Sequence, residues 1–283
     1  MHAVFSCGKT HRSFPRLFER MVASFSKSVV LPLISFVYQS VRKAKMLFKL
    51  FYLNISMAET NVSLVYRALT SSLASSEVKI VDSHAVSAIA KSLGFKPNVV
   101  LNGLVRGGYL LPVYFSGVYY LLDSDELNTK YLKKKSFEIV AAACNHCFGK
   151  NWYYGLGSSL YLGGITGQSP KEFFIITDSH LPVLFEFGGI AFRIRKLSVK
   201  DYSLEIKEGG LLRFSSPART LTDYLYFYLK EGKRDYAVEV ASGIIHSFPK
   251  AKAHLNNKLI SIYPSPYNLA VAYAADLVRD RNV

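Results

Sequence analysis

The 283-residue chain carries 35 Lys+Arg against 20 Asp+Glu, a net charge of +15, and half of its residues are hydrophobic. Its three cysteines are too few for the disulfide framework of a secreted domain. Composition therefore predicts a cytoplasmic protein without membrane contact, and the positive charge favours a polyanionic partner.

The first 56 residues differ in composition from the rest of the chain. They contain nine Lys+Arg and a single acidic residue, Glu19. Their one apolar run, residues 29–38, is shorter than the about 20 residues of a membrane-spanning helix, and a basic stretch at 42–49 replaces a signal-peptide cleavage site. We expect residues 1–56 to be a disordered or over-extended start, with translation beginning at Met57; a membrane-surface amphipathic anchor is the alternative.

A helix-turn-helix pattern follows this leader. Asp82 or Ser83 can cap an amphipathic helix that ends at Gly94, and Pro97 begins a second helix that ends at Arg106. The turn between the two helices is only three residues long. A further helix over residues 63–72 supplies the third wall of a small apolar core.

Two β-rich runs after the second helix predict a hairpin. They cover residues 109–114 and 118–122, and a further strand is predicted at 78–81. This order of helices and strands is typical of a winged helix-turn-helix DNA-binding domain, which we place at residues 57–122.

The second helix presents a polar stripe. Asn98, Asn102 and Arg106 recur at every fourth residue, and apolar residues occupy the opposite side. Asparagine and arginine can make paired hydrogen bonds to adenine and guanine edges in the major groove of double-stranded DNA. We predict that these three residues read bases and that Lys96 contacts a phosphate. The hairpin tip is predicted to contact the DNA backbone through Tyr114, Phe115 and Ser116.

The charge of this domain limits the prediction. Residues 57–134 hold eight Lys+Arg against six Asp+Glu and are nearly neutral. Because phosphate neutralisation supplies most non-specific affinity, DNA binding would require a homodimer or the basic residues of the C-terminal part. The alternative is a protein-interaction module, a winged helix that docks a protein instead of DNA.

The rest of the chain is predicted to be a linker, or a connecting helix, at residues 123–135 and a second domain at 136–283. Strands cluster before helices, which favours an α+β domain with a largely antiparallel sheet. The predicted strands cover 152–156, 173–177, 182–187, 191–197, 204–207 and 211–214. Helices are predicted from 136 and at 158–162, 218–229, 236–246 and 269–278.

Cysteine and histidine occur together at residues 144–147, in the order Cys-Asn-His-Cys. A structural zinc site needs four ligands, and no second pair follows at a suitable spacing. Cys144 and Cys147 fit better as small apolar residues of a helix. We therefore predict no metal and no cofactor.

Two blocks of the second predicted domain carry motifs: Tyr-Tyr-Gly-Leu-Gly-Ser-Ser-Leu at 153–160, Gly-Ile-Thr-Gly-Gln-Ser-Pro at 164–170 and Phe-Ile-Ile-Thr at 174–177 form the first, and Pro-Ala-Arg-Thr-Leu-Thr-Asp at 217–223 the second. Both blocks resemble AbiEi-type antitoxins. Residues 153–177 are similar to the block that opens that family's C-terminal domain, with Tyr-Tyr-Ile-Ser, Ser-Ala-Leu, His-Gly-Leu-Thr and Gln-x-Pro before a strand that ends in Thr. Residues 217–223 are similar to the family's Pro-Glu-Arg-Thr-Leu-x-Asp. The matching positions are Tyr154, Ser158, Leu160, Gly164, Gln168, Pro170, Pro217, Arg219, Thr220 and Asp223.

The resemblance covers roughly residues 60–245 and implies an antitoxin of a type IV toxin-antitoxin system, active in phage defence. Its winged helix would repress its own operon, and its C-terminal domain would neutralise a nucleotidyltransferase-like toxin. The chain departs from the family at Ser159, Gly163 and Ala218, where Ala, His and Glu are usual. From their residue types alone, the motif positions are structural, since Arg219 and Asp223 can pair on one helix face.

The enzyme alternative is a nuclease. Glu205 and Lys207 on a predicted strand, with Asp178 upstream, form the carboxylate and Glu-x-Lys pattern that can hold a divalent ion beside a phosphodiester. Exposed strands give Glu-x-Lys by simple alternation. We therefore predict no catalytic residue, and the protein is not expected to be an enzyme.

Overall fold

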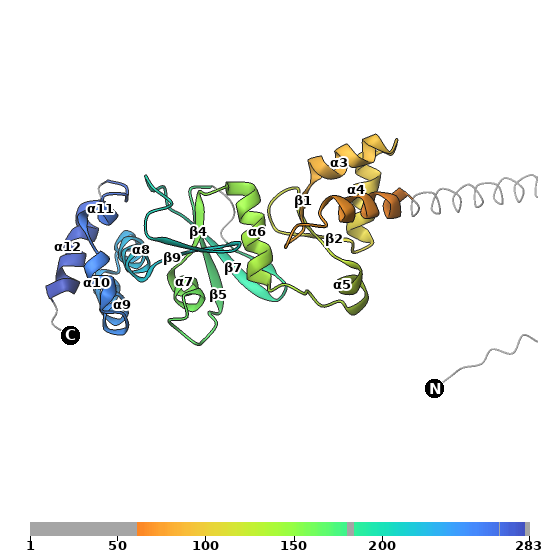
Figure 1. Cartoon of the computed structure of the whole chain (residues 1–283). Coiled ribbons are helices and arrows are strands. Elements are labelled where there is room, and N and C mark those ends of the chain that lie inside the picture. Colours follow the sequence, from red (N-terminus) through yellow and green to blue (C-terminus); the bar gives the residue numbers. More distant parts are fainter. Residues whose placement is uncertain (1–60, 180–183, 266, 281–283) are drawn as a thin grey trace, which may run out of the picture. The chain divides into compact units, whose positions relative to one another are not determined.

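The computed structural model describes residues 61–179, 184–265 and 267–280. Residues 61–283 form one compact unit of the predicted α+β class, with a three-stranded and a six-stranded sheet (Figure 1). In the described ranges, no helix is long and apolar enough to cross a membrane. The predicted leader over residues 1–56 and the start at Met57 lie outside the described residues.

The first part of this unit follows the predicted order of elements. A helix over residues 61–72 comes first. It is followed by β1 (Ile80–Asp82), α3 (Ser83–Ser92), α4 (Pro97–Arg106), β2 (Leu110–Pro112) and β3 (Val118–Leu121). The strands pair antiparallel in the order β1-β3-β2, so that β3 lies in the middle.

Local chemistry sets where α3 and α4 begin and end. Asp82 caps α3, because its Oδ1 accepts a hydrogen bond of 2.7 Å from the backbone N–H of Ala85. Gly94 follows α3 with a φ of +77°, a left-handed conformation that favours glycine. Pro97 is the first residue of α4, where a helix needs no backbone donor.

The segment predicted as a linker contains a short helix, α5 (Ser124–Thr129). Asp123 and Glu126 form a capping box at its start. The buried Glu126 carboxylate accepts hydrogen bonds from the Tyr120 hydroxyl at 2.7 Å and from the Lys133 backbone N–H at 2.8 Å. These contacts hold the segment against β3.

The second part contains α6 (Ser136–Phe148) and the six-stranded sheet. Its strands are β4 (Trp152–Gly155), β5 (Glu172–Thr177), β6 (Leu184–Phe187), β7 (Ile190–Lys196), β8 (Ile206–Gly209) and β9 (Leu212–Ser215), in the order β6-β7-β5-β4-β9-β8. The pairs β4–β5, β6–β7 and β8–β9 are antiparallel, whereas β5–β7 and β4–β9 are parallel. The sheet is therefore mixed, with antiparallel pairs in the majority.

Six further helices complete the second part. They are α7 (Leu156–Leu162), α8 (Pro217–Lys230), α9 (Arg234–Ser247), α10 (Lys250–His254), α11 (Asn257–Ile260) and α12 (Tyr267–Asp280). The sequence pattern does not indicate α10 and α11, because helices of five and four residues are too short to show apolar periodicity.

The large sheet separates two apolar clusters. Trp152 and Tyr154 of β4 pack with α6, whereas Tyr153 packs with α8, α9 and α12. The three rings are fully buried, and they alternate because successive side chains of a strand point to opposite faces. The α6 cluster also contains Phe115, next to β3. The β-hairpin therefore shares a cluster with the second part, whereas α3 and α4 pack around a third cluster of their own that includes Val86 and Leu104.

Candidate nucleic-acid interface

Helix α4 exposes the three polar residues predicted to read bases. Asn98, Asn102 and Arg106 are all exposed. Within the described ranges, none of their side chains forms a hydrogen bond or an ion pair with another residue. Their four-residue spacing places them in one row along the helix. Free amide and guanidinium groups are thus presented together.

Packing fixes which side of α4 faces outward. Val100 and Leu104 are buried on the opposite side. A Cβ atom at Gly103 would lie 2.4 Å from Cγ2 of Val62, so that only glycine allows the helix over residues 61–72 to approach this closely. Rotation of α4 would disrupt this packing, and the polar row therefore stays at the surface.

The acidic residues near this face have partners elsewhere. Glu77 and Asp82 are the only acidic residues between positions 61 and 122. Glu77 pairs with Lys134 at 2.8 Å, and Asp82 lies 3.1 Å from Nε2 of His146. The exposed basic residues of the helix pair are Lys91, Lys96 and Arg106. Residues 83–106 contain no acidic residue, so the formal charges of the helix pair are all positive.

The prediction that Phe115 contacts DNA is wrong. Its side chain is 4% exposed and packs edge-on against Phe148 and Phe185, with ring centroids 5.3 and 5.9 Å apart. Tyr114 stacks on Phe185 at 4.6 Å and is partly exposed, and Ser116 is exposed. Burial removes the apolar ring from water and is favourable, whereas a contact with the hydrated phosphate backbone would leave the ring in water. The hairpin tip is thus packed against the second part of the unit.

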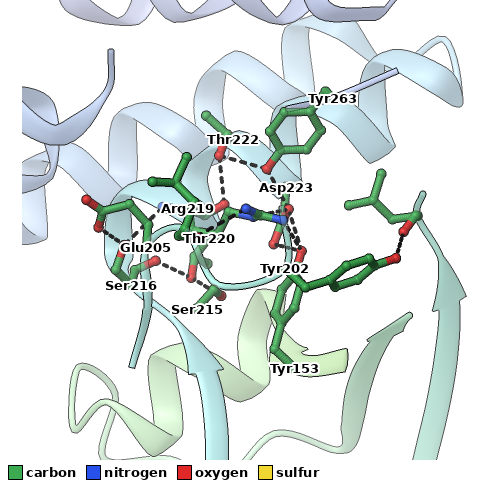
Figure 2. A network of polar contacts seen from close by, with 12 residues as sticks. Tyr153, Tyr202, Glu205, Ser215, Ser216, Arg219, Thr220, Thr222, Asp223 and Tyr263 are labelled. Atoms are coloured by element: carbon green, nitrogen blue, oxygen red, sulfur yellow. Dashed lines mark hydrogen bonds and ion pairs between the residues drawn. The ribbon is translucent and has the colours of Figure 1, made fainter. Parts of the chain in front are cut away.

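The second motif block, residues 217–223, contributes side chains to a buried polar network (Figure 2). Arg219 and Asp223 of α8 are fully buried, and Nε of Arg219 lies 3.4 Å from Oδ1 of Asp223. The hydroxyls of Tyr153 and Tyr263 donate to the Asp223 carboxylate at 3.0 and 2.6 Å. Arg219 donates to the Leu204 carbonyl at 3.2 Å. These contacts give the motif pair a structural place in the core.

Burial and pairing act in opposite directions on these groups. Burial raises the pKa of the Asp223 carboxyl above its ordinary value, whereas Arg219 and the two phenol donors lower it. Burial also raises the pKa of the Tyr153 and Tyr263 hydroxyls well above the ordinary value. Both phenols therefore keep their protons at neutral pH and can donate to the carboxylate.

Hydroxyl groups extend the network to neighbouring elements. Oγ1 of Thr220 lies 2.7 Å from Oγ of both Ser159 and Ser215. Oγ of Ser158 accepts a hydrogen bond of 2.6 Å from the Phe174 backbone N–H. Small hydroxyl residues in the motif therefore connect α7 with α8, β5 and β9.

The remaining motif residues do not converge on one site. Tyr154 donates a hydrogen bond of 2.7 Å to the Phe137 carbonyl, and Pro217 is the first residue of α8. Leu160 packs on the cluster that contains α8. The loop between α7 and β5 carries Gly164, Gln168 and Pro170. Core contacts and loop conformation account for these positions better than a shared binding site.

The residues of the nuclease alternative are not assembled around a metal site. Glu205 and Lys207 line a cavity of about 270 Å³ whose lining does not include Asp178. The Glu205 carboxylate accepts a hydrogen bond of 2.7 Å from Oγ of Ser216 and lies 3.2 Å from Nδ1 of His254. Among the described residues, no group of three or more His, Cys, Asp or Glu side chains could hold a metal ion.

Cys144 and Cys147 lie on α6, the predicted helix. Cys144 is buried, which raises the pKa of its thiol. Partial burial and the nearby Asp82 carboxylate raise the pKa of Cys147 to about 11. Cys144 thus fits the predicted place of a small apolar residue, whereas Cys147 is exposed.

Two side chains that the sequence did not predict lie at the sites described above: Tyr263 in the buried network and Val99 beside the polar row of α4. Tyr263 reaches Asp223 from 40 positions later in the chain, and no local pattern indicates that contact. Val99 is 54% exposed beside Asn98 and Asn102. A signal for Val99 was available, since it lies one turn before Asn102 on the same side of α4.

Comparisons with known proteins assign no family. No protein-family model and no curated protein matches the chain. Among solved structures, the chain is similar to the RV2827C protein from Mycobacterium tuberculosis, with 12% identity and a TM-score of 0.48. The match covers 77% of this chain and 76% of that chain. Likeness at this level assigns no function.

Proposed function

We propose that this protein is a cytoplasmic DNA-binding regulator in which residues 61–122 act as a winged helix-turn-helix and α4 enters the major groove. The observation that carries the proposal is the row of Asn98, Asn102 and Arg106, which is exposed and free of partners among the described residues. A recognition helix needs such free donors and acceptors, because it exchanges hydration for hydrogen bonds to base edges.

The roles within the row follow from side-chain chemistry. The amide of Asn98 or Asn102 can bond both N6 and N7 of adenine, and the guanidinium of Arg106 can bond O6 and N7 of guanine. Lys96 precedes the first turn of α4, where its ammonium group can reach a phosphate. Because few basic groups surround α4, we propose that a homodimer or the basic C-terminal residues add the remaining affinity.

The resemblance to AbiEi-type antitoxins extends this proposal. We propose that the protein represses its own operon and that residues 136–283 neutralise a nucleotidyltransferase-like toxin without catalysis. The buried network around Arg219 and Asp223 supports a structural use of the matching motif, since neither side chain is exposed to a substrate.

DNA binding is tested with the full chain and the duplex upstream of its gene. The double variant Asn102→Ala, Arg106→Ala should lose at least tenfold in affinity, because a bidentate base contact contributes about 1–3 kcal/mol. A gel shift at fixed salt measures the loss. Asn128→Ala with Lys130→Gly is the matched control, since both residues are exposed and lie outside the helix pair and the C-terminal part, and glycine suits the φ of +59° at residue 130. Equal affinity of the double variant and the wild type would refute the base-reading assignment.

Toxin neutralisation is tested separately by co-expression with the protein encoded by the neighbouring reading frame. The Asn102→Ala, Arg106→Ala variant should still rescue growth, because its C-terminal part is unchanged. Failure of the wild type to rescue growth would remove the antitoxin proposal and leave the DNA-binding proposal intact.

A protein-docking winged helix is the second candidate. The near-neutral charge of residues 57–134, eight Lys+Arg against six Asp+Glu, favours it, because phosphate neutralisation supplies most non-specific DNA affinity. Phosphate contacts make DNA affinity fall steeply with salt. Absent or salt-insensitive DNA binding would therefore favour this second candidate.

A further inference from the structure

Val99 is the exposed apolar side chain of α4. It is 54% exposed, whereas Val100 and Leu104 of the same helix are buried. A single exposed valine is ordinary on a protein surface, so exposure alone carries no argument. Its place does, because Val99 lies beside the row that the proposed function assigns to base edges, three residues before Asn102.

Position along the helix strengthens this point. Val99 is the third residue of α4, and in helix-turn-helix proteins the N-terminal residues of the recognition helix contact base edges. Val99 and Asn102 are three residues apart, which makes their side chains neighbours on the helix surface. The two side chains should therefore face adjacent bases.

The chemistry of the groove limits what an isopropyl group can recognise. The thymine 5-methyl is the apolar feature that base pairs present in the major groove. Against the cytosine amino group, Val99 would displace water from a donor without replacing its hydrogen bond. We propose that Val99 is a specificity-determining residue that packs on a thymine methyl group, next to the base read by Asn102. This inference rests on the proposed DNA-binding function.

The test uses the full chain and a duplex selected from a random pool. Each thymine of the selected site is replaced singly by deoxyuridine, which lacks only the methyl group. At one position the wild type should lose about fourfold in affinity, the value expected for one buried methyl group. Val99→Ser should bind the thymine and deoxyuridine duplexes equally at that position. Val99→Ile should bind the thymine duplex more tightly, as the wild type does.

Controls separate the inference from the proposed function. Leu184→Ala removes an apolar side chain of similar exposure, 52%, on β6, and should leave the methyl preference unchanged. Circular dichroism checks that each variant is folded. A selected site with no methyl-dependent thymine, or a preference that persists in Val99→Ser, would overturn this inference alone. If the wild type selects no sequence, the DNA-binding proposal fails as well.

Discussion

At the scale of single residues, the Arg219–Asp223 pair depends on its surroundings. Four-residue spacing predicts that the two side chains can meet on one helix face. It does not predict that both are fully buried, with Tyr153 and Tyr263 donating to the carboxylate. Removing two charges from water is costly, and pairing compensates only when hydrogen bonds satisfy the remaining atoms. The phenols supply those bonds to the carboxylate, whereas Nε of Arg219 has no hydrogen-bond partner among the described residues.

Asp223→Asn should lower the free energy of unfolding by about 3–5 kcal/mol, because it leaves the Arg219 charge buried without a counter-charge. Urea unfolding of the full chain measures the loss. Glu231→Gln is the matched control: Glu231 pairs with Arg195 at 2.6 Å near the surface, and such pairs contribute at most about 1 kcal/mol. Equal losses in the two variants would contradict the role given to burial.

At the scale of elements, backbone conformation explains why one strand begins two residues later than predicted. The pattern predicts a strand at 204–207, whereas β8 covers Ile206–Gly209. Glu205 has a φ of +55°, a left-handed conformation that extended strands do not contain. The parallel pairs β5–β7 and β4–β9 join strands that are not consecutive. Alternation within a strand predicts neither the bend nor the partner.

The turn between β6 and β7 offers a matched pair of glycines. Gly188 and Gly189 have φ values of +56° and +76°. A Cβ atom at Gly188 would lie 2.3 Å from Oγ of Ser136, whereas one at Gly189 would meet nothing within 4 Å. Gly189→Ala should lose about 1–2 kcal/mol from the left-handed conformation alone. Gly188→Ala should lose about 1–3 kcal/mol more from overpacking against α6. Urea unfolding compares them, and equal losses would count against the contact.

At the scale of the whole molecule, the hairpin of the helix-turn-helix segment shares an apolar cluster with the large sheet, whereas α3 and α4 pack around a separate cluster. Phe115 packs on Phe148 of α6 and Phe185 of β6. The segment predicted as a linker is held by Glu126, which is buried beside Tyr120. A shared apolar cluster favours cooperative unfolding, because unfolding of either part would expose the apolar surface that both parts bury.

Phe115→Ala should lower the stability of both parts together, by about 3–5 kcal/mol. The fluorescence of Trp152, the only tryptophan, reports on the large sheet, and amide hydrogen exchange of α3 and α4 reports on the helix pair. Both should shift by the same free energy. Tyr131→Ala is the control, since that side chain is 80% exposed. A shift confined to one probe would show that the two parts unfold independently.

The amino-acid sequence by itself determined the order of the longer helices and the strands, the start of α3 at Asp82 or Ser83 and the outward row of Asn98, Asn102 and Arg106. Those features arise from capping side chains and apolar periodicity, which act between residues close in the chain. Only the tertiary structure decided that Phe115 is buried and that Tyr153 and Tyr263 enclose the Arg219–Asp223 pair. Such contacts join residues far apart in the chain, and their free energy depends on packing that no local pattern encodes.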